Sequence, residues 1–343
     1  MQPRVGLAEY LDPARFAEHH RALASRVADL RAAAGPTCPA LVVWPEYVAT
    51  FLVLAGRGRE VAGCTTVDGA LRRVVARHPL ALVAVMARHR TSRLTPAVLT
   101  MFAPLAYGHY VATFSAIARD LGAWVVAGSG LFPRNGRGDT SDVLVPASAD
   151  VYNTSLTFAS DGRVAGVTRK MNVVPTQEDV LGLCAASPSE LAVLDTPVGR
   201  IGTLICYDGF REAHTGQEPR FVRGAPLLDA LGAEIVAQPS ANAWPWAAPW
   251  VFNEPGQSQL RSEQWFSEGM AAELPALDSV RYVVNPQLTG DVLDAHFEAP
   301  SLVLGRTTQG TEVLARAADP SAEEVLHVRA VLGSGDGAAT VDR

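Results

Sequence analysis

Three apolar stretches of this sequence each lead to a side chain that could take part in catalysis. The side chains are Glu46, Lys170 and Cys206, and the stretches begin at Leu41, Val164 and Ile201. Burial at a strand end raises the pKa of a carboxyl group, which can then act as a general base near neutral pH. A thiol followed by a tight turn lies beside free backbone N–H groups, which lower its pKa and can stabilise an oxyanion. We therefore predict nucleophilic catalysis by Cys206.

Each of these residues also has a structural explanation when it is taken alone. A strand-end glutamate commonly serves as a cap or as a salt-bridge partner. A strand-end lysine is commonly solvated, and a buried cysteine is commonly part of the core. Lys170 is nevertheless the single lysine of the chain, so 28 of its 29 basic side chains (Lys plus Arg) are arginines. Arginine replaces lysine readily at solvated sites, but not where a compact ammonium is required. The single remaining lysine is therefore either required by specific chemistry or has escaped replacement by arginine by chance.

The composition is that of a globular enzyme. Of the 343 residues, 48% are hydrophobic and 19% are charged, which is enough apolar material for a large core. We expect one domain over residues 1–332 and a disordered, Gly-rich tail over 333–343. The formal net charge of −6, without a basic stripe, gives no indication of nucleic-acid binding. No apolar run approaches the ~18 residues that span a membrane.

The cysteines give no indication of a metal or a cofactor. Cys38, Cys64, Cys184 and Cys206 are far apart, and neither a Cys-x-x-Cys nor a His-Glu-x-x-His pattern occurs. The N-terminal residues do not have the pattern of a signal peptide. We expect a reduced, cytoplasmic protein that acts on a small molecule without a cofactor or metal.

The spacing of apolar residues predicts alternating helices and strands. Helical spacing is found over residues 13–34, 70–77, 80–88, 107–121, 227–231 and 258–278, and strand patterns over 4–8, 41–44, 124–127, 152–159, 164–169, 201–206, 234–237, 282–284, 301–304 and 312–315. Ser160-Asp161-Gly162-Arg163 is a strong hairpin signal between two of these strands. The alternation favours an α/β fold, and the hairpins favour mixed rather than purely parallel sheets.

The order of Glu46, Lys170 and Cys206, with the residues around them, resembles the nitrilase superfamily of carbon–nitrogen hydrolases over nearly the whole chain. The matching motifs are Trp44-Pro45-Glu46, Tyr152-Asn153-Thr154, Asp161-Gly162, Arg169-Lys170, Ile205-Cys206-Tyr207-Asp208 and Pro239-Ser240-Ala241-Asn242. The resemblance implies a four-layer αββα sandwich of mixed sheets. The segment after Glu46 is longer than in family members, so we expect an insertion at about residues 55–105. Members generally pair their sheets across a two-fold interface, which implies a homodimer or higher homo-oligomer.

The resemblance also assigns roles to the reactive residues. Cys206 is the nucleophile that forms a thioester, and Glu46 is its base. Lys170 and the backbone N–H of Tyr207 stabilise the oxyanion. Glu178 falls where many members have a second glutamate, which orients Lys170 or assists the base.

The substrate implied by this resemblance is a small amide or an N-carbamoyl compound. True nitrilases commonly have Cys-Trp-Glu where this chain has Cys206-Tyr207-Asp208, so a nitrile is the alternative substrate. Four aromatic residues beside the motifs are expected to line a substrate pocket, although core packing explains the tryptophans equally well. These residues are Tyr47, Tyr207, Trp244 and Trp246.

Two functions of other classes are kept as alternatives. A papain-like thiol hydrolase would pair Cys206 with a histidine, for example His214, and would not need Lys170. A catalytically inactive protein of the same fold would serve as a binding or assembly module. A serine hydrolase is disfavoured because Gly128-Ser129-Gly130 lacks the Gly-x-Ser-x-Gly spacing.

Overall fold

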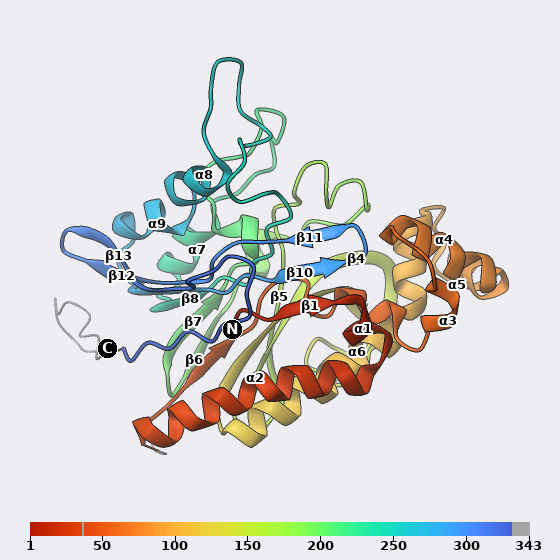
Figure 1. Ribbon diagram of the computed structural model, residues 1–343, viewed down its shortest axis with the longest axis horizontal. Helices are drawn as coiled ribbons and strands as arrows, with labels where there is room; N and C mark the ends of the chain where they lie inside the picture. Colours follow the sequence, from red (N-terminus) through yellow and green to blue (C-terminus); the bar gives the residue numbers. More distant parts are fainter. Residues whose placement is uncertain (36–37, 331–343) are drawn as a thin grey trace.

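The computed structural model describes residues 1–35 and 38–330, so the tail expected over 333–343 lies outside the described residues. Two β-sheets form the centre of the molecule, with helices on their outer sides (Figure 1). The first sheet has the order β2-β3-β4-β5. Its strands are β2 (Leu41–Val43), β3 (Trp124–Asn135), β4 (Pro146–Phe158) and β5 (Val164–Arg169). The pair β2–β3 is parallel and the other two pairs are antiparallel.

The second sheet has six strands in the order β13-β12-β9-β8-β7-β6. They are β6 (Val193–Thr196), β7 (Gly199–Thr203), β8 (Ile235–Ala237), β9 (Tyr282–Asn285), β12 (Leu302–Thr307) and β13 (Gly310–Arg316). The central strands β7, β8 and β9 are parallel, and the outer pairs are antiparallel. A small third sheet joins the start of the chain to a late segment through β1 (Arg4–Gly6), β10 (Thr289–Val292) and β11 (Ala295–Phe297).

Apolar side chains from the two larger sheets meet between them. This cluster contains Val43, Val126, Ile201, Ile235, Ala237 and Tyr282. On the outer side of the first sheet lie α2 (Pro13–Ala34) and α6 (Leu94–Leu121), and on that of the second lie α7 (Gly224–Ala230), α8 (Arg261–Glu268) and α9 (Met270–Glu273). Because strands covered on both faces are apolar throughout, the sequence shows them as continuous apolar runs. The expected α/β sandwich of mixed sheets is confirmed.

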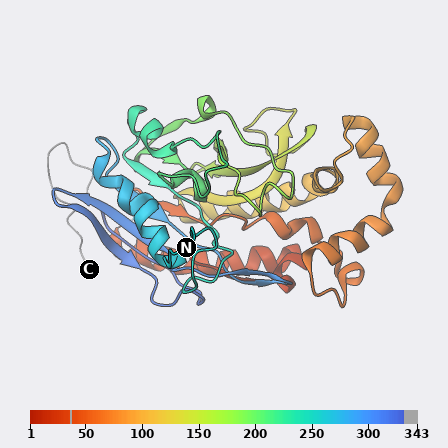
Figure 2. The same cartoon turned by 90° about the horizontal axis from the view of Figure 1, so that it is seen from above.

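A group of short helices projects from one end of the molecule (Figures 1 and 2, orange). It contains α3 (Gly58–Val61), α4 (Val67–Arg77) and α5 (Pro79–His89), and we call residues 57–93 the helical arm. Thr66 caps α4 by accepting a hydrogen bond from the Gly69 N–H at 3.0 Å. Pro79 begins α5, a position where the missing N–H costs nothing. The helices expected over 70–77 and 80–88 are confirmed, and the arm falls within the segment that the resemblance assigns to an insertion.

Two expected helix boundaries are wrong. The helix expected to begin at Tyr107 begins at Leu94, because Pro104 lies on its exposed side and the loss of one hydrogen bond is outweighed by burial of the other side. The single helix expected over 258–278 is divided into α8, α9 and the 3-10 turn Leu274–Ala276, with breaks at Gly269 and near Pro275. None of the helices in the described ranges is long and apolar enough to cross a membrane.

Candidate active site

Glu46 follows β2 in a tight turn that lies against the neighbouring strand β3. The Trp44 N–H donates to the Val126 carbonyl at 2.8 Å, which continues the parallel pairing by one residue. Gly128 has a φ of +71°, and a Cβ at this position would lie 2.0 Å from the Pro45 carbonyl oxygen. Only glycine therefore permits this close approach. The turn directs Glu46 into the interior, where its side chain is 1% exposed.

Lys170 is the first residue after β5 and is delivered by the β4–β5 hairpin. Its backbone N–H donates to the Asn153 carbonyl at 2.9 Å. The chain beyond it is held by the buried carboxylate of Asp208, which accepts hydrogen bonds from the N–H groups of Met171 and Asn172 at 2.8–3.2 Å. Asp208 belongs to the same turn as the candidate nucleophile, so the lysine and cysteine segments are tied directly to each other.

Cys206 lies in a turn beyond β7 rather than at the end of the strand. β7 ends at Thr203, and Cys206 begins a 3-10 turn with a φ of +49°, which non-glycine residues rarely adopt. Its N–H donates to the Pro239 carbonyl at 2.8 Å, and its carbonyl accepts from Gln238 Nε2 at 2.9 Å. These bonds hold the strained conformation. Within the described ranges the N–H of the next residue, Tyr207, has no acceptor.

Glu46, Lys170 and Glu178 form one buried network. Lys170 Nζ lies 2.7 Å from Glu46 Oε1 and 2.9 Å from Glu178 Oε2. Asn153 Nδ2 donates to both carboxylates, at 2.7 and 2.8 Å, and Tyr47 OH donates to Glu178 Oε1 at 2.6 Å. Removing one partner of a buried ion pair costs about 3–5 kcal/mol because the other charge is left uncompensated. The members of this network therefore hold one another in place.

Glu46 also connects this network to the pocket of the thiol: its carboxylate accepts a hydrogen bond from the Ala241 N–H at 3.1 Å, and Cys206 lines the same pocket. Burial raises the pKa of Glu46, and the charge of Lys170 opposes that shift. Burial alone would lower the pKa of Lys170, but the charges of Glu178 and Glu46 raise it well above its usual range. Lys170 is thus permanently charged beside a basic carboxyl group.

The pKa of the Cys206 thiol is shifted in the direction opposite to the one predicted. Burial, followed by the charge of Glu46, raises it to about 12. The sequence-based expectation of a lowered pKa is wrong, because desolvation of a thiolate outweighs the effect of nearby N–H groups. The resting thiol is neutral and needs a base to become a nucleophile.

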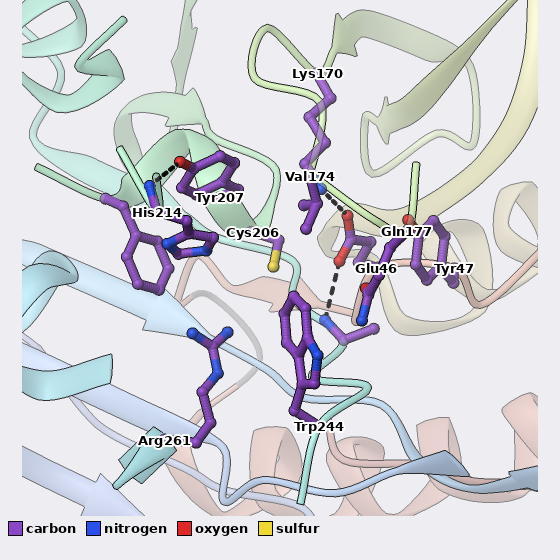
Figure 3. Close-up of a pocket in the computed structure, with 12 residues that line it drawn as sticks. Glu46, Tyr47, Lys170, Val174, Gln177, Cys206, Tyr207, His214, Trp244 and Arg261 are labelled. Atoms are coloured by element: carbon purple, nitrogen blue, oxygen red, sulfur yellow. Dashed lines mark hydrogen bonds and ion pairs between the residues drawn. The ribbon is translucent and has the colours of Figure 1, made fainter. Parts of the chain in front are cut away.

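A small pocket opens onto these side chains (Figure 3). Its free volume is about 10 Å³, roughly the space of one water molecule. Its walls are formed by Glu46, Tyr47, Lys170, Val174, Gln177, Cys206, Tyr207, Phe210, His214, Ala241, Trp244 and Arg261. Three of the four aromatic residues expected at the pocket are therefore part of it. The fourth, Trp246, is not, and its ring packs against Trp265 at 6.0 Å between centroids.

Sequence motifs do not identify Arg261 as a site residue, since it is one of 28 arginines. Its side chain is 2% exposed and lies against several aromatic rings. Asn153 and Asp208 were within the motifs that carry the resemblance, but no role was predicted for either. The structure gives both a positioning role, since Asn153 bridges the two carboxylates and Asp208 joins two segments of the site.

His214 lines the pocket without pairing with the thiol. Its ring stacks on Tyr207 at 3.9 Å between centroids, and Nδ1 lies 3.4 Å from Gln264 Nε2. Burial and the charge of Arg261 hold the pKa of His214 well below its usual range. In the described part of the chain no hydrogen bond joins this ring to Cys206, so the geometry does not support the papain-like alternative. Nor does any group of three or more His, Cys, Asp and Glu side chains there have the arrangement of a metal site.

Comparison with solved structures finds the same fold at low sequence identity. A mutant of the amidase from Nesterenkonia sp. AN1, showing the result of Michael addition of acrylamide at its active-site cysteine, has 16% identity and a TM-score of 0.51, with 94% of this chain and 88% of that chain covered. The carbon–nitrogen hydrolase from Helicobacter pylori G27 has 18% identity and a TM-score of 0.51, with 83% of this chain and 87% of that chain covered.

Comparison with protein families is more decisive. A search of the curated proteins finds no match. The carbon–nitrogen hydrolase family model, however, matches residues 5–213, which is more than half of the chain and includes Glu46, Lys170 and Cys206. The match confirms the resemblance inferred from the motifs: this chain belongs to the carbon–nitrogen hydrolase family.

Proposed function

We propose that this carbon–nitrogen hydrolase is an amidase-like enzyme that cleaves small amides or N-carbamoyl compounds through a thioester on Cys206. The observation that carries the proposal is the position of Lys170, the only lysine of the chain, between the carboxylates of Glu46 and Glu178. The same pocket is lined by the Cys206 thiol and by the Glu46 carboxylate. Burying charges costs free energy, and a protein that only binds or assembles has no need of this arrangement.

In the first half-reaction, Cys206 attacks the amide carbon. Because the pKa of its thiol is raised to about 12, the proton moves to Glu46 as the sulfur–carbon bond forms. The substrate oxygen takes the negative charge and meets the Lys170 ammonium and the free N–H of Tyr207. Glu46 then passes the proton to the leaving nitrogen and the carbon–nitrogen bond breaks. Ammonia or an amine leaves, and the acyl group stays on sulfur as a thioester.

In the second half-reaction, water hydrolyses the thioester. Glu46 takes a proton from the water as its oxygen attacks the acyl carbon, the carbon–sulfur bond breaks, and the proton returns to the thiolate. Glu178 contacts no reacting atom in this scheme. Together with Asn153 and Tyr47 it holds Lys170, so we assign it a positioning role.

Two observations favour an amide over a nitrile. The nucleophile is followed by Tyr207-Asp208 instead of the Trp-Glu that is common in true nitrilases. The structural neighbour from Nesterenkonia sp. AN1 is an amidase, and a mutant of it shows the result of Michael addition of acrylamide at the active-site cysteine. Nitrile hydrolysis is the second candidate function, since the same nucleophile, base and cation would serve it.

Ammonia release from small amides, N-carbamoyl amino acids and nitriles tests the proposal. We expect turnover of amides or N-carbamoyl compounds. After an acid quench, intact-mass measurement should detect an acyl adduct that is absent from Cys206→Ala. Turnover of nitriles alone would reverse the choice of substrate. No turnover and no adduct with any compound would favour the binding or assembly module.

We also propose that the chain forms a homodimer or a higher homo-oligomer. The helical arm is the surface that we expect to contribute, because its α5 helix exposes large apolar side chains, with Leu80 84% and Val83 62% exposed. Exposed apolar surface of this kind commonly marks a protein contact. The cytoplasmic location stays a prediction from the sequence.

A further inference from the structure

A second buried cation lines the active-site pocket. Arg261 is the first residue of α8, and its side chain is 2% exposed. Its guanidinium points into the pocket on the side of Cys206 (Figure 3). Lys170 is neutralised by two carboxylates, but no described carboxylate lies within 4.0 Å of the Arg261 nitrogens. Arg261 is therefore a buried charge without an ion-pair partner in the described chain.

The hydrogen bonds of Arg261 leave one donor group open to the pocket. Nε donates to Asn242 Oδ1 at 2.9 Å, and Nη1 donates to Gln264 Oε1. Both acceptors are uncharged amides. Nη2 has no acceptor among the described residues, and it is not one of the unpartnered atoms that are sealed inside the protein. The unused donor therefore faces the space that a substrate would enter.

Aromatic rings hold the guanidinium but do not neutralise it. Its central carbon lies 4.2 Å from the ring centroid of Trp250, 4.9 Å from Trp265, 5.0 Å from Trp244 and 5.7 Å from Phe210. Cation–π contacts stabilise a cation by less than its desolvation costs. Consistent with this imbalance, burial lowers the pKa of Arg261 to about 9. An anion from outside the chain would offset the remaining desolvation cost of the guanidinium.

We infer that Arg261 binds a carboxylate of the substrate, so that the preferred substrates are amides or N-carbamoyl compounds with a carboxylate beyond the scissile bond. This inference rests on the proposed function. A guanidinium presents planar N–H donors that match the geometry of a carboxylate. Lys170 cannot take this role, because its charge is already neutralised by the ion pairs with Glu46 and Glu178.

Matched pairs of substrates test the inference directly. The pairs are malonamate and malonamide, succinamate and succinamide, and glutaramate and glutaramide. Within each pair the distal group is either a carboxylate or a neutral amide of the same size. For the chain length that fits, we expect kcat/KM of the wild-type enzyme to be about 10- to 100-fold higher for the carboxylate, as for other charge-assisted hydrogen bonds. Most of the difference should lie in KM.

Variants of Arg261 separate recognition from structure. In Arg261→Gln the ratio of kcat/KM within the pair should fall to near 1, because the charge is lost. In Arg261→Lys, which keeps a cation among the rings, the ratio should fall by about 10-fold, because an ammonium lacks the planar fork. The control is Arg316→Gln on β13, whose exposed guanidinium also lies over a ring, Phe266, at 5.7 Å. Its ratio should equal that of the wild type.

The outcomes distinguish this inference from the proposed function. If no member of any pair and no amide or N-carbamoyl compound of the ammonia-release panel is turned over, the proposed function fails. If the enzyme turns over compounds of that panel that lack a carboxylate but no carboxylate member of any pair, the inference about Arg261 fails and the proposed function stands. If the wild type turns over both members at a ratio near 1, only the role of Arg261 fails. If Arg261→Gln does not fold, the folded Arg261→Lys enzyme decides, and an unchanged ratio in that variant overturns the inference.

Discussion

The pocket and the helical arm both depart from the usual pattern of exposed charged residues and buried apolar ones. The pocket buries charged side chains, whereas the arm exposes apolar side chains. Around the pocket, two carboxyl groups and two basic side chains are each at most 2% exposed, namely Glu46, Glu178, Lys170 and Arg261. On the arm, the apolar side chains of Leu80 and Val83 are 84% and 62% exposed. Buried charge and exposed large apolar surface are both unfavourable in an isolated chain. Each therefore indicates a requirement that comes from outside the chain.

The two regions also differ in how firmly their side chains are held. Lys170 is fixed by two ion pairs, and the carboxylates that hold it are themselves bridged by Asn153. The outward side of α5, in contrast, carries apolar side chains that are mostly exposed to solvent. A substitution at the pocket should therefore change catalysis, and often stability as well, whereas one on the outer side of the arm should change association alone.

The largest effect is expected from removal of the nucleophile. Cys206→Ala should lower kcat/KM by on the order of 10⁵–10⁶, as for other enzymes that lose their nucleophile. Cys184→Ala is the control, because this half-buried thiol lies outside the pocket and should be dispensable. Ammonia release measures activity, and circular dichroism with thermal unfolding checks the fold. Substantial residual activity in Cys206→Ala would contradict the assignment.

The next largest effect is expected from Lys170→Arg, which keeps the charge but changes its shape. A guanidinium is too wide for the space between the two carboxylates, and loss of one oxyanion donor costs about 10²–10³ in kcat. The control is the reverse exchange Arg72→Lys on the arm, where the exposed Arg72 pairs with Asp68 at 2.8 Å. It should be silent. A folded Lys170→Arg enzyme with normal kcat would mean that Lys170 is only a counter-ion.

A smaller change is expected from Glu178→Gln, and its signature lies in the pH profile. Burial raises the pKa of Glu46, and the charge of Glu178 raises it further. Glu46 must be deprotonated to accept the thiol proton, so activity is lost as the pH falls through this pKa. Without the Glu178 charge that pKa is lower, and the acid limb of kcat/KM should move to lower pH.

The size of the decrease in kcat provides a second comparison between Glu178 and Glu46. Displacement of Lys170 should lower kcat of Glu178→Gln by up to about 10²-fold. Glu46→Gln should lose about 10²–10⁴, together with the acid limb itself. An acid limb that stays in place or moves to higher pH in Glu178→Gln would contradict the assignment of Glu46 as the base.

Much of the site could be predicted from the sequence because its reacting groups lie in local motifs. Glu46, Lys170 and Cys206 each lie within three residues of the end of an apolar strand, and the single lysine is visible by counting. Arg261 could not be predicted, because its significance depends on rings that come from separate segments, Phe210 and Trp250 among them. The pKa of Cys206 was predicted with the wrong sign, because the amount of protein covering the thiol is not encoded locally.

The layers of the fold could be predicted, but the joining of distant segments could not. Apolar runs, alternation and the hairpin signal predict an α/β fold with mixed strand pairing, and the family resemblance implies two sheets with helices on either side. The parallel pairing of Arg4 with Thr289, which joins the start of the chain to a segment near its end, has no local signal. Helix α6 extends past Pro104 because burial of one side outweighs a missing hydrogen bond, and such a balance depends on tertiary packing.

The smallest effect on activity is expected on the arm. Residues 57–93 contain eight arginines and two acidic residues, which gives this segment a formal charge of +6 in a chain of net charge −6. The acidic remainder of a second copy would therefore attract this surface.

We expect light scattering to give at least twice the 36.4 kDa of one chain. Leu80→Glu with Val83→Glu should lower that mass without changing kcat, because two carboxylates would have to be buried in the contact. Val143→Glu, at another apolar side chain that is 50% exposed, should leave the mass unchanged. A monomeric wild type would contradict the oligomer, and an unaltered mass in the double variant would show that the copies meet elsewhere.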